Sequence, residues 1–176
     1  MASGSGQIAS GQKKDNTMTM NMSSEMPRGG TLCLSHPELT IGGTASKIKT
    51  AAPNGLGVDY AINGIIYNVL DSVGDRTVTA AAVQAELTAC IYLVTLNAAG
   101  TLATVKGTAV LSADITAGKK SLAWPQPAAD TCPIGAIKVV TTSGNDFTAG
   151  TDDWNDAGST FTWYDFMAIP TDPITA

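Results

Sequence analysis

Short alternations of apolar and polar residues, each ended by turn residues, fill the chain from Thr31 onward. A period of two places every second side chain on the same face of a strand. The turn signals recur about every 8–12 residues, a spacing typical of all-β sandwiches and barrels. The sequence therefore predicts a single all-β domain over residues 31–176. We expect an antiparallel β-sandwich or barrel, and a jelly-roll arrangement is one form that it can take.

Two hairpins stand out among the predicted strands. VDYAI and IIYNVL enclose Asn63-Gly64, a dipeptide that favours a two-residue turn. CIYLVTL and TLATVKG enclose NAAG and predict a second hairpin. TLCLS, ELTI and KIKTA supply further strands before these hairpins, and AIKVVTT and TFTWYDF supply the last two.

One short helix is expected over residues 77–89, TVTAAAVQAELTA. Its Ala, Gln and Glu residues favour a helix, and Thr77 or Thr79 could cap its start, although it carries no large apolar face. The stretch LAWPQPAADTCP contains three prolines and predicts an extended, irregular link. These prolines are Pro125, Pro127 and Pro133.

Residues 1–30 differ from the rest of the chain, because they are rich in Gly, Ser, Met and Asn and poor in branched apolar residues. Such a segment buries too little surface to fold alone, so we expect a flexible or extended N-terminal arm. Met18, Met20 and Met22 alternate and would share one face of an extended segment. The segment is either a disordered tail, or an arm that lays these side chains and Met26 into grooves of a neighbouring subunit.

Charge is scarce, because 14% of the residues are charged against about 25% in average globular chains. A neutral surface of this kind is often covered by partner subunits, although an extracellular β protein can also have one. The net charge is −5 and no basic cluster exceeds a lysine pair, which argues against nucleic-acid binding. No apolar run approaches the roughly 20 residues that span a membrane, so no membrane association is expected.

Three widely separated cysteines, Cys33, Cys90 and Cys132, lack the spacing of a metal site. Their odd number and apolar neighbours favour reduced, partly buried thiols in a protein made in a cytosol. One disulfide with a third, free thiol is the alternative.

Catalytic chemistry has few candidates in this sequence. His36 is the single histidine and precedes a proline in an expected turn, and no nucleophile, phosphate-loop or zinc motif occurs. The acidic residues Asp146, Asp152, Asp153 and Asp156 do not match the spacing of an EF-hand. We expect them to hydrogen-bond their own backbone in a polar loop, with an irregular calcium site as the alternative. We therefore expect that the chain is not an enzyme and that it needs no cofactor or metal.

Aromatic residues gather late in the chain, at Trp154, Phe161, Trp163, Tyr164 and Phe166. In a strand, Phe161 and Trp163 share one face, while Tyr164 and Phe166 share the other. One face would meet the core, and the other would meet either more of the core or a neighbouring subunit. Trp154, Trp163 and Tyr164 are the partner contacts predicted within the domain.

KIKTAAPNGLGVDYAINGIIYNV, ACIYLVTLNAAGTLATVKG and PIGAIKVVTTSGNDFTAGTDD, with TFTWYDF, span most of residues 46–166. In pattern and order these stretches resemble a module of small virion proteins of tailed bacteriophages, although no functional residues align. The resemblance implies a structural virion protein, most simply a capsid decoration or cement protein on the outer surface of the head. It further implies contacts with the major capsid protein and with copies of itself, often as a trimer, and assembly in the host bacterial cytoplasm.

Two other functions remain open at this point. One is a carbohydrate- or receptor-binding or connecting module of a head fibre, neck or tail, in which exposed Trp154 and Trp163 would stack on sugar rings. The other is a hydrolase that uses the acidic loop.

Overall fold

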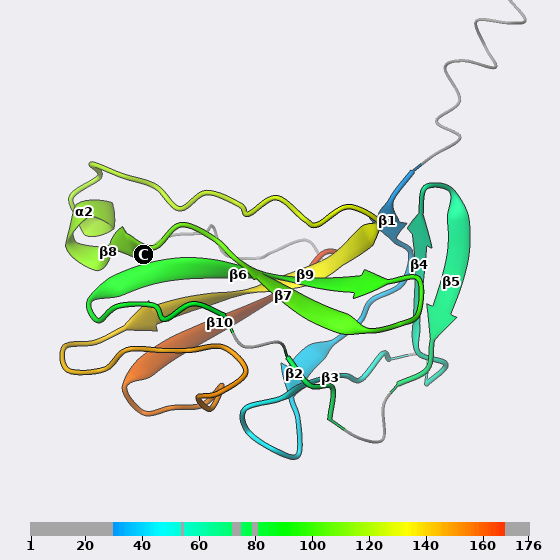
Figure 1. Cartoon of the computed structure of the whole chain (residues 1–176), viewed down its shortest axis with the longest axis horizontal. Coiled ribbons are helices and arrows are strands. Elements are labelled where there is room, and N and C mark those ends of the chain that lie inside the picture. The colour runs from blue at the N-terminus through cyan, green and yellow to red at the C-terminus, as the bar shows by residue number, and fades with distance from the viewer. Residues whose placement is uncertain (1–29, 54, 72–74, 79–80, 168–176) are drawn as a thin grey trace, which may run out of the picture.

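The structure, a computed structural model, describes residues 30–53, 55–71, 75–78 and 81–167. The predicted arm, with Met18, Met20, Met22 and Met26, lies outside the described residues except for Gly30. Strands dominate the described part and pair antiparallel, so the predicted all-β class is confirmed (Figure 1). Within these ranges, no helix combines the length and the apolar character that crossing a membrane would require.

A five-stranded antiparallel sheet forms the larger layer of the fold. Its strands are β6 (Thr88–Asn97), β7 (Leu102–Lys106), β8 (Val110–Leu111), β9 (Thr131–Thr141) and β10 (Ser159–Asp165). The order is β10-β9-β6-β7, and β8 pairs with the start of β6. Nearly every side chain of β6 and β9 is buried, so both faces of this sheet are covered.

Two smaller sheets cover one face of the large sheet and give a sandwich-like fold. Their strands are β1 (Leu32–Cys33), β2 (Leu39–Ile41), β3 (Ile48–Thr50), β4 (Val58–Ile62) and β5 (Ile65–Val69). One sheet has the order β1-β4-β5, and β2 pairs with β3 in the other. The main hydrophobic core lies between these layers and includes Leu39, Ile48, Val58, Tyr60, Tyr92, Val94, Ile137 and Val139.

The opposite face of the large sheet is covered by an extended segment, residues 117–130, which we call the crossing segment. It follows the short helix α2 (Ser112–Thr116) and runs along the sheet to the start of β9 (Figure 1). Leu122 packs there against a second, smaller core of Ile91, Leu93 and Ala136. The predicted irregular link is therefore real, and it serves as a cover for the sheet.

Both predicted hairpins are confirmed. Ile62 and Ile65 are paired across the Asn63-Gly64 turn, where φ is 51° for Asn63 and 81° for Gly64. Positive φ at both positions is what a two-residue turn needs to match the twist of its strands. The β6–β7 pair forms the second hairpin.

The helix predicted over residues 77–89 is wrong. The described residues up to 87 are not helical, and the last two positions begin β6. The side chain of Gln84 is fully buried and donates to the carbonyl oxygens of Thr88 and Val139, at 3.1 Å each. Its backbone exchanges two hydrogen bonds with Phe147, at 2.7 and 3.0 Å. An alanine-rich segment has little apolar surface to bury as a helix, so these bonds hold it extended against the sheet.

Pro133 lies inside β9, which corrects the predicted extent of the irregular link. Val94 is opposite Gly135 but Thr95 is opposite Pro133, so Ile134 is an extra residue, a β-bulge. Proline has no backbone N–H, and strands accept it where a bulge interrupts the ladder. The irregular link therefore ends where β9 begins.

Replacing Gln84 with Ala tests how residues 81–87 are held. We expect Gln84→Ala to lower the free energy of unfolding by about 1–3 kcal/mol, because two buried carbonyl oxygens each lose one hydrogen bond. Urea denaturation measures the loss. Val83→Ala, at an exposed neighbouring side chain, is the control and should change stability by less than about 0.5 kcal/mol. A stability gain for Gln84→Ala would instead support a helix, since alanine is the best helix former.

Candidate functional site

The loop between β9 and β10, residues 142–158, holds the acidic residues and carries one indole into the core. Trp154 has 0% of its surface exposed. Its ring lies edge-on to Tyr92, Phe147 and Phe161, with centroid distances of 5.9, 5.0 and 6.0 Å. Such aromatic pairs add to the free energy gained from burial alone. The loop is therefore fastened from the inside by a buried aromatic cluster.

Trp154 also ties the loop to the connection between β2 and β3. Its backbone N–H donates to the carbonyl oxygen of Ala45 at 2.8 Å, and its indole Nε1 donates to that of Ser46 at 3.2 Å. The polar edge of the buried ring is thus satisfied, which removes the cost of burying an unpaired donor.

The structure contradicts the predicted exposure of Trp154, and with it half of the sugar-stacking surface. Trp163 is half-buried, packs against the main core and lies 6.0 Å from the Trp154 ring. Tyr164 is buried as well. The late aromatics that were predicted as partner contacts belong largely to the chain's own core. Their clustering in the sequence therefore reflects packing within the chain's own core.

One acidic residue of this loop, Asp152, stabilises a turn through its side chain. Asp152 accepts the backbone N–H of Thr148 through Oδ2 at 2.6 Å, and donates its own N–H to the Thr148 carbonyl at 2.9 Å. The N–H of Asp156 donates to the carbonyl of Asp153 at 3.1 Å, and Ser159 donates to Asp156 at the same distance. Asp152 therefore has the turn role expected of Asp in a polar loop, whereas Asp153 and Asp156 contribute through their backbone.

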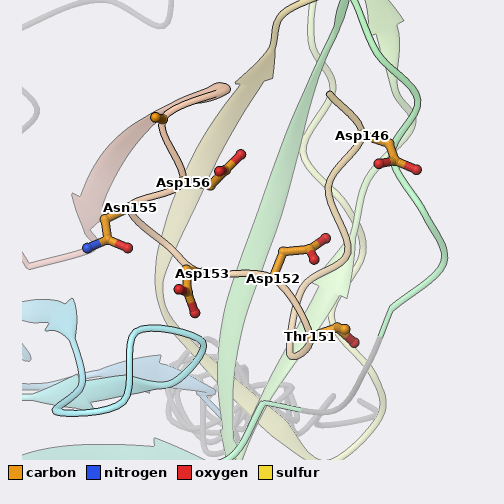
Figure 2. A pocket seen from close by; sticks show the side chains of 7 residues that line it. Asp146, Thr151, Asp152, Asp153, Asn155 and Asp156 are labelled. Atoms are coloured by element: carbon orange, nitrogen blue, oxygen red, sulfur yellow. The ribbon is translucent and has the colours of Figure 1, made fainter. Parts of the chain in front are cut away.

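The four acidic residues of the loop line a surface hollow of about 520 Å³. Figure 2 shows the side chains of Asp146, Asp152, Asp153 and Asp156 fanning out from the loop, and they do not meet at one point. Among the described residues, no group of three or more His, Cys, Asp or Glu is arranged to hold a metal ion. The calcium alternative thus has only the acidic composition of the loop in its favour.

His36 pairs with Asp165 at the end of β10. His36 Nε2 lies 2.9 Å from Oδ2 of Asp165, and the N–H of Leu39 donates to Oδ1 at 3.1 Å. Burial raises the pKa of the Asp165 carboxyl, while the bonds from Leu39 and His36 oppose that rise. The arrangement ties the turn before β2 to the large sheet, as expected for a hydrogen-bonded turn histidine.

All three cysteines are free and buried, which confirms the predicted reduced thiols. Burial raises the pKa of Cys90 to about 11 and that of Cys132 to about 12, and nearby Cys33 adds to the second rise. Burial also raises the pKa of Cys33 itself. Thiols with these pKa values stay protonated at neutral pH, and the protonated form is a poor nucleophile.

An apolar groove opens where the two ends of the described chain meet. We call it the chain-end groove; it measures about 350 Å³ and is lined by Leu32, Pro133, Phe166 and Met167, among others. Trp124 is 45% exposed and contacts Phe166 edge-to-face, with a centroid distance of 5.7 Å. Trp124 was not among the residues predicted from the sequence to contact a partner. Its position was the signal that could have identified it, because the alternation of a strand does not account for an aromatic residue in a proline-rich link.

Replacing Trp154 with Ala tests the buried cluster. The substitution should lower the free energy of unfolding by about 3–5 kcal/mol, since it removes a fully buried ring and leaves a cavity. Chemical denaturation followed by circular dichroism measures this. Asn155→Ala, at the exposed next residue, serves as the control, and equal effects of the two substitutions would contradict the burial of Trp154.

The thiols give a second test. A disulfide-type thiol reagent at pH 8 should leave Cys33, Cys90 and Cys132 unmodified in the folded chain, because burial and raised pKa values suppress the thiolate. All three should react once the chain is unfolded in guanidinium chloride. Rapid modification of any one in the folded state would show that its burial is wrong.

Comparisons of the chain with protein-family models, with curated proteins and with solved structures find no match in any of the three.

Proposed function

We propose that this protein is a structural component of a bacteriophage particle, a decoration or cement protein on the outer surface of the head. The order of its hairpins and strands resembles small virion proteins, and 14% charged residues leave a surface suited to burial against other subunits. The proposal assigns no reaction to the protein. Its role would be to add contacts between capsid subunits.

The observation that carries the proposal is the amount of large apolar side chain left exposed on a well-packed β body. Twelve large hydrophobic residues of the described part are exposed. Exposed apolar side chains that gather in one region of a folded protein favour that region as a place where another molecule binds. Eight of the twelve lie in or beside the β4–β5 hairpin or around the chain-end groove: Leu56, Ile65, Ile66, Leu70, Leu32, Trp124, Phe166 and Met167.

The proposed arm would start beside these surfaces. The carbonyl of Gly30 accepts a hydrogen bond from the N–H of Gly64, at the turn between β4 and β5, at 3.0 Å. Both the hairpin and β1 lie at the end of the molecule opposite α2 (Figure 1). Thirty extended residues reach about 100 Å, which is enough to cross into a neighbouring subunit. Met18, Met20, Met22 and Met26 remain the predicted contacts of this arm.

Stabilisation of the head would follow from mass action. A protein that binds the assembled shell, and not its separated subunits, lowers the free energy of the shell by an amount that grows with its concentration. Contacts with the major capsid protein and with other copies of this chain, as a trimer or another oligomer, would supply that binding. Assembly would take place in the host bacterial cytoplasm, where the three free thiols stay reduced.

Removing residues 1–29 tests the proposal at its arm. We expect the shortened protein to occupy fewer sites on isolated heads than the full chain does, because the arm's contacts are lost. Its unfolding transition should be unchanged. Occupancy is measured by sedimentation of heads followed by quantitative gel analysis. Equal occupancy would rule out the arm, and binding of neither protein to heads would rule out the decoration function.

A matched pair of full-length variants separates side-chain contacts from chain length. Changing Met18, Met20 and Met22 together to Ser should lower head occupancy. Changing the intervening Thr17, Thr19 and Asn21 to Ser should leave it nearly unchanged, because those side chains would lie on the opposite face of an extended arm.

A further inference from the structure

Strand β5 has a free edge. Among the described strands it pairs only with β4, and it is the outermost strand of its sheet (Figure 1). Ile62 and Ile65 close the two-residue turn as a pair, and the hydrogen-bonded pairs of an antiparallel ladder then alternate from that point. Ile66 and Asn68 therefore point their N–H and C=O groups away from β4, toward the open side.

This edge lacks the features that protect most exposed edges. Natural edge strands carry charges, prolines or bulges that prevent another strand from adding to them. The sequence of β5 is IIYNV, and its register with β4 continues without a bulge. Ile65 is 59% exposed and Ile66 is 71% exposed. By contrast, the outer strand β7 of the large sheet ends in the charged residue Lys106.

The chemistry of the hairpin indicates what would cover it. Asp59 is the one charged residue between Leu56 and Leu70, and it lies on β4, where it accepts a hydrogen bond from Asn68 Nδ2 at 2.8 Å. A partner strand with charged side chains would find no counter-charge on β5. A neutral, apolar strand that also has an open edge fits, and β5 of a second copy is such a strand.

We propose that β5 pairs antiparallel with β5 of a second copy around a twofold axis at Tyr67. This register places Ile66 opposite the partner's Asn68, and Asn68 opposite the partner's Ile66. Each of these two pairs can exchange both of its backbone hydrogen bonds. Two three-stranded sheets would then join edge to edge. The same patch serves both copies, as a twofold interface requires, and no like charges face each other within it.

The size of this contact sets its strength. A stable interface buries about 800 Å² on each partner, and one five-residue strand supplies only part of that area. The pairing should therefore be weak between free copies and strong where other contacts already hold two copies side by side. It does not depend on the proposed function, because it rests on β5 alone. A twofold contact cannot close a trimer, but it can link a trimer to its neighbour.

A cysteine at the axis tests the pairing in the full-length protein. Residues directly opposite each other in a non-hydrogen-bonded pair have Cβ atoms about 4.5–5.5 Å apart, close to disulfide geometry. Tyr67→Cys should therefore form a covalent dimer under mild oxidation with oxidised glutathione. The native thiols are buried, so the new thiol is the one available to react. Gel electrophoresis without reductant measures the rate.

Two variants complete this test. Leu111→Cys places a thiol on an apolar side chain that is 51% exposed in β8, away from β5, and it should cross-link several-fold more slowly. Ile66→Pro removes one outward N–H without touching the β4 ladder, and edge strands accept proline at such positions. Adding Ile66→Pro to Tyr67→Cys should bring the cross-linking rate down to that of Leu111→Cys.

Amide hydrogen exchange on the unmodified chain provides a readout that does not depend on how Tyr67→Cys folds. The amides of Ile66 and Asn68 should be protected at high protein concentration and lose that protection on dilution. Free exchange of both amides at every concentration would overturn the proposal. So would protection that persists on dilution, since a strand of the same chain would then cover the edge. Cross-linking of Tyr67→Cys no faster than Leu111→Cys, in a folded variant, would overturn it as well.

Discussion

The pairing of β6 with β9 is the interaction on which the rest of the structure depends. Both strands are buried on both faces, so their ladder has to be covered twice. Tyr92 and Val94 face the main core under the smaller sheets, whereas Ile91 and Leu93 face the core under the crossing segment. A strand buried on both faces reads as a continuous apolar run, which is why CIYLVTL shows little alternation. Because the large sheet must be covered on both faces, the chain contains a long, proline-rich connection that runs across one of them.

The composition of the acidic loop is explained by the turns that place Trp154 in the core. After β9 the chain must leave the sheet, deliver Trp154 to the main core and return as β10. Each reversal needs a turn, and Asp, Asn and Gly are the residues that turns favour. The carboxylates then stand on the outside of the loop, where they line an open hollow. A cluster of acids in sequence can thus arise from turn geometry around one buried ring.

How far the sequence could predict this fold depended on how local each determinant is. Asn63-Gly64 encodes its turn within two residues, and that hairpin was predicted correctly. Gln84 is held by Val139 and Phe147, more than fifty positions away, so local propensity indicated a helix that does not form. The burial of Trp154 depends in the same way on distant rings. The predicted arm contacts lie outside the described residues and stay predictions.

An unprotected edge strand is a hazard for a protein that works alone, because edges of this kind lead to indiscriminate sheet extension. The short length of β5 limits that hazard. The strand has five residues, so few backbone groups are open, and the pairing that they can make is weak for free copies.

Such an edge is useful where several weak contacts must act together. Strand β1, which lines the chain-end groove and begins two residues after Gly30, lies at the same end of the molecule as β5 (Figure 1). Contacts that are individually weak but geometrically linked form together on a template and not in dilute solution, which is the behaviour that the proposed decoration function requires.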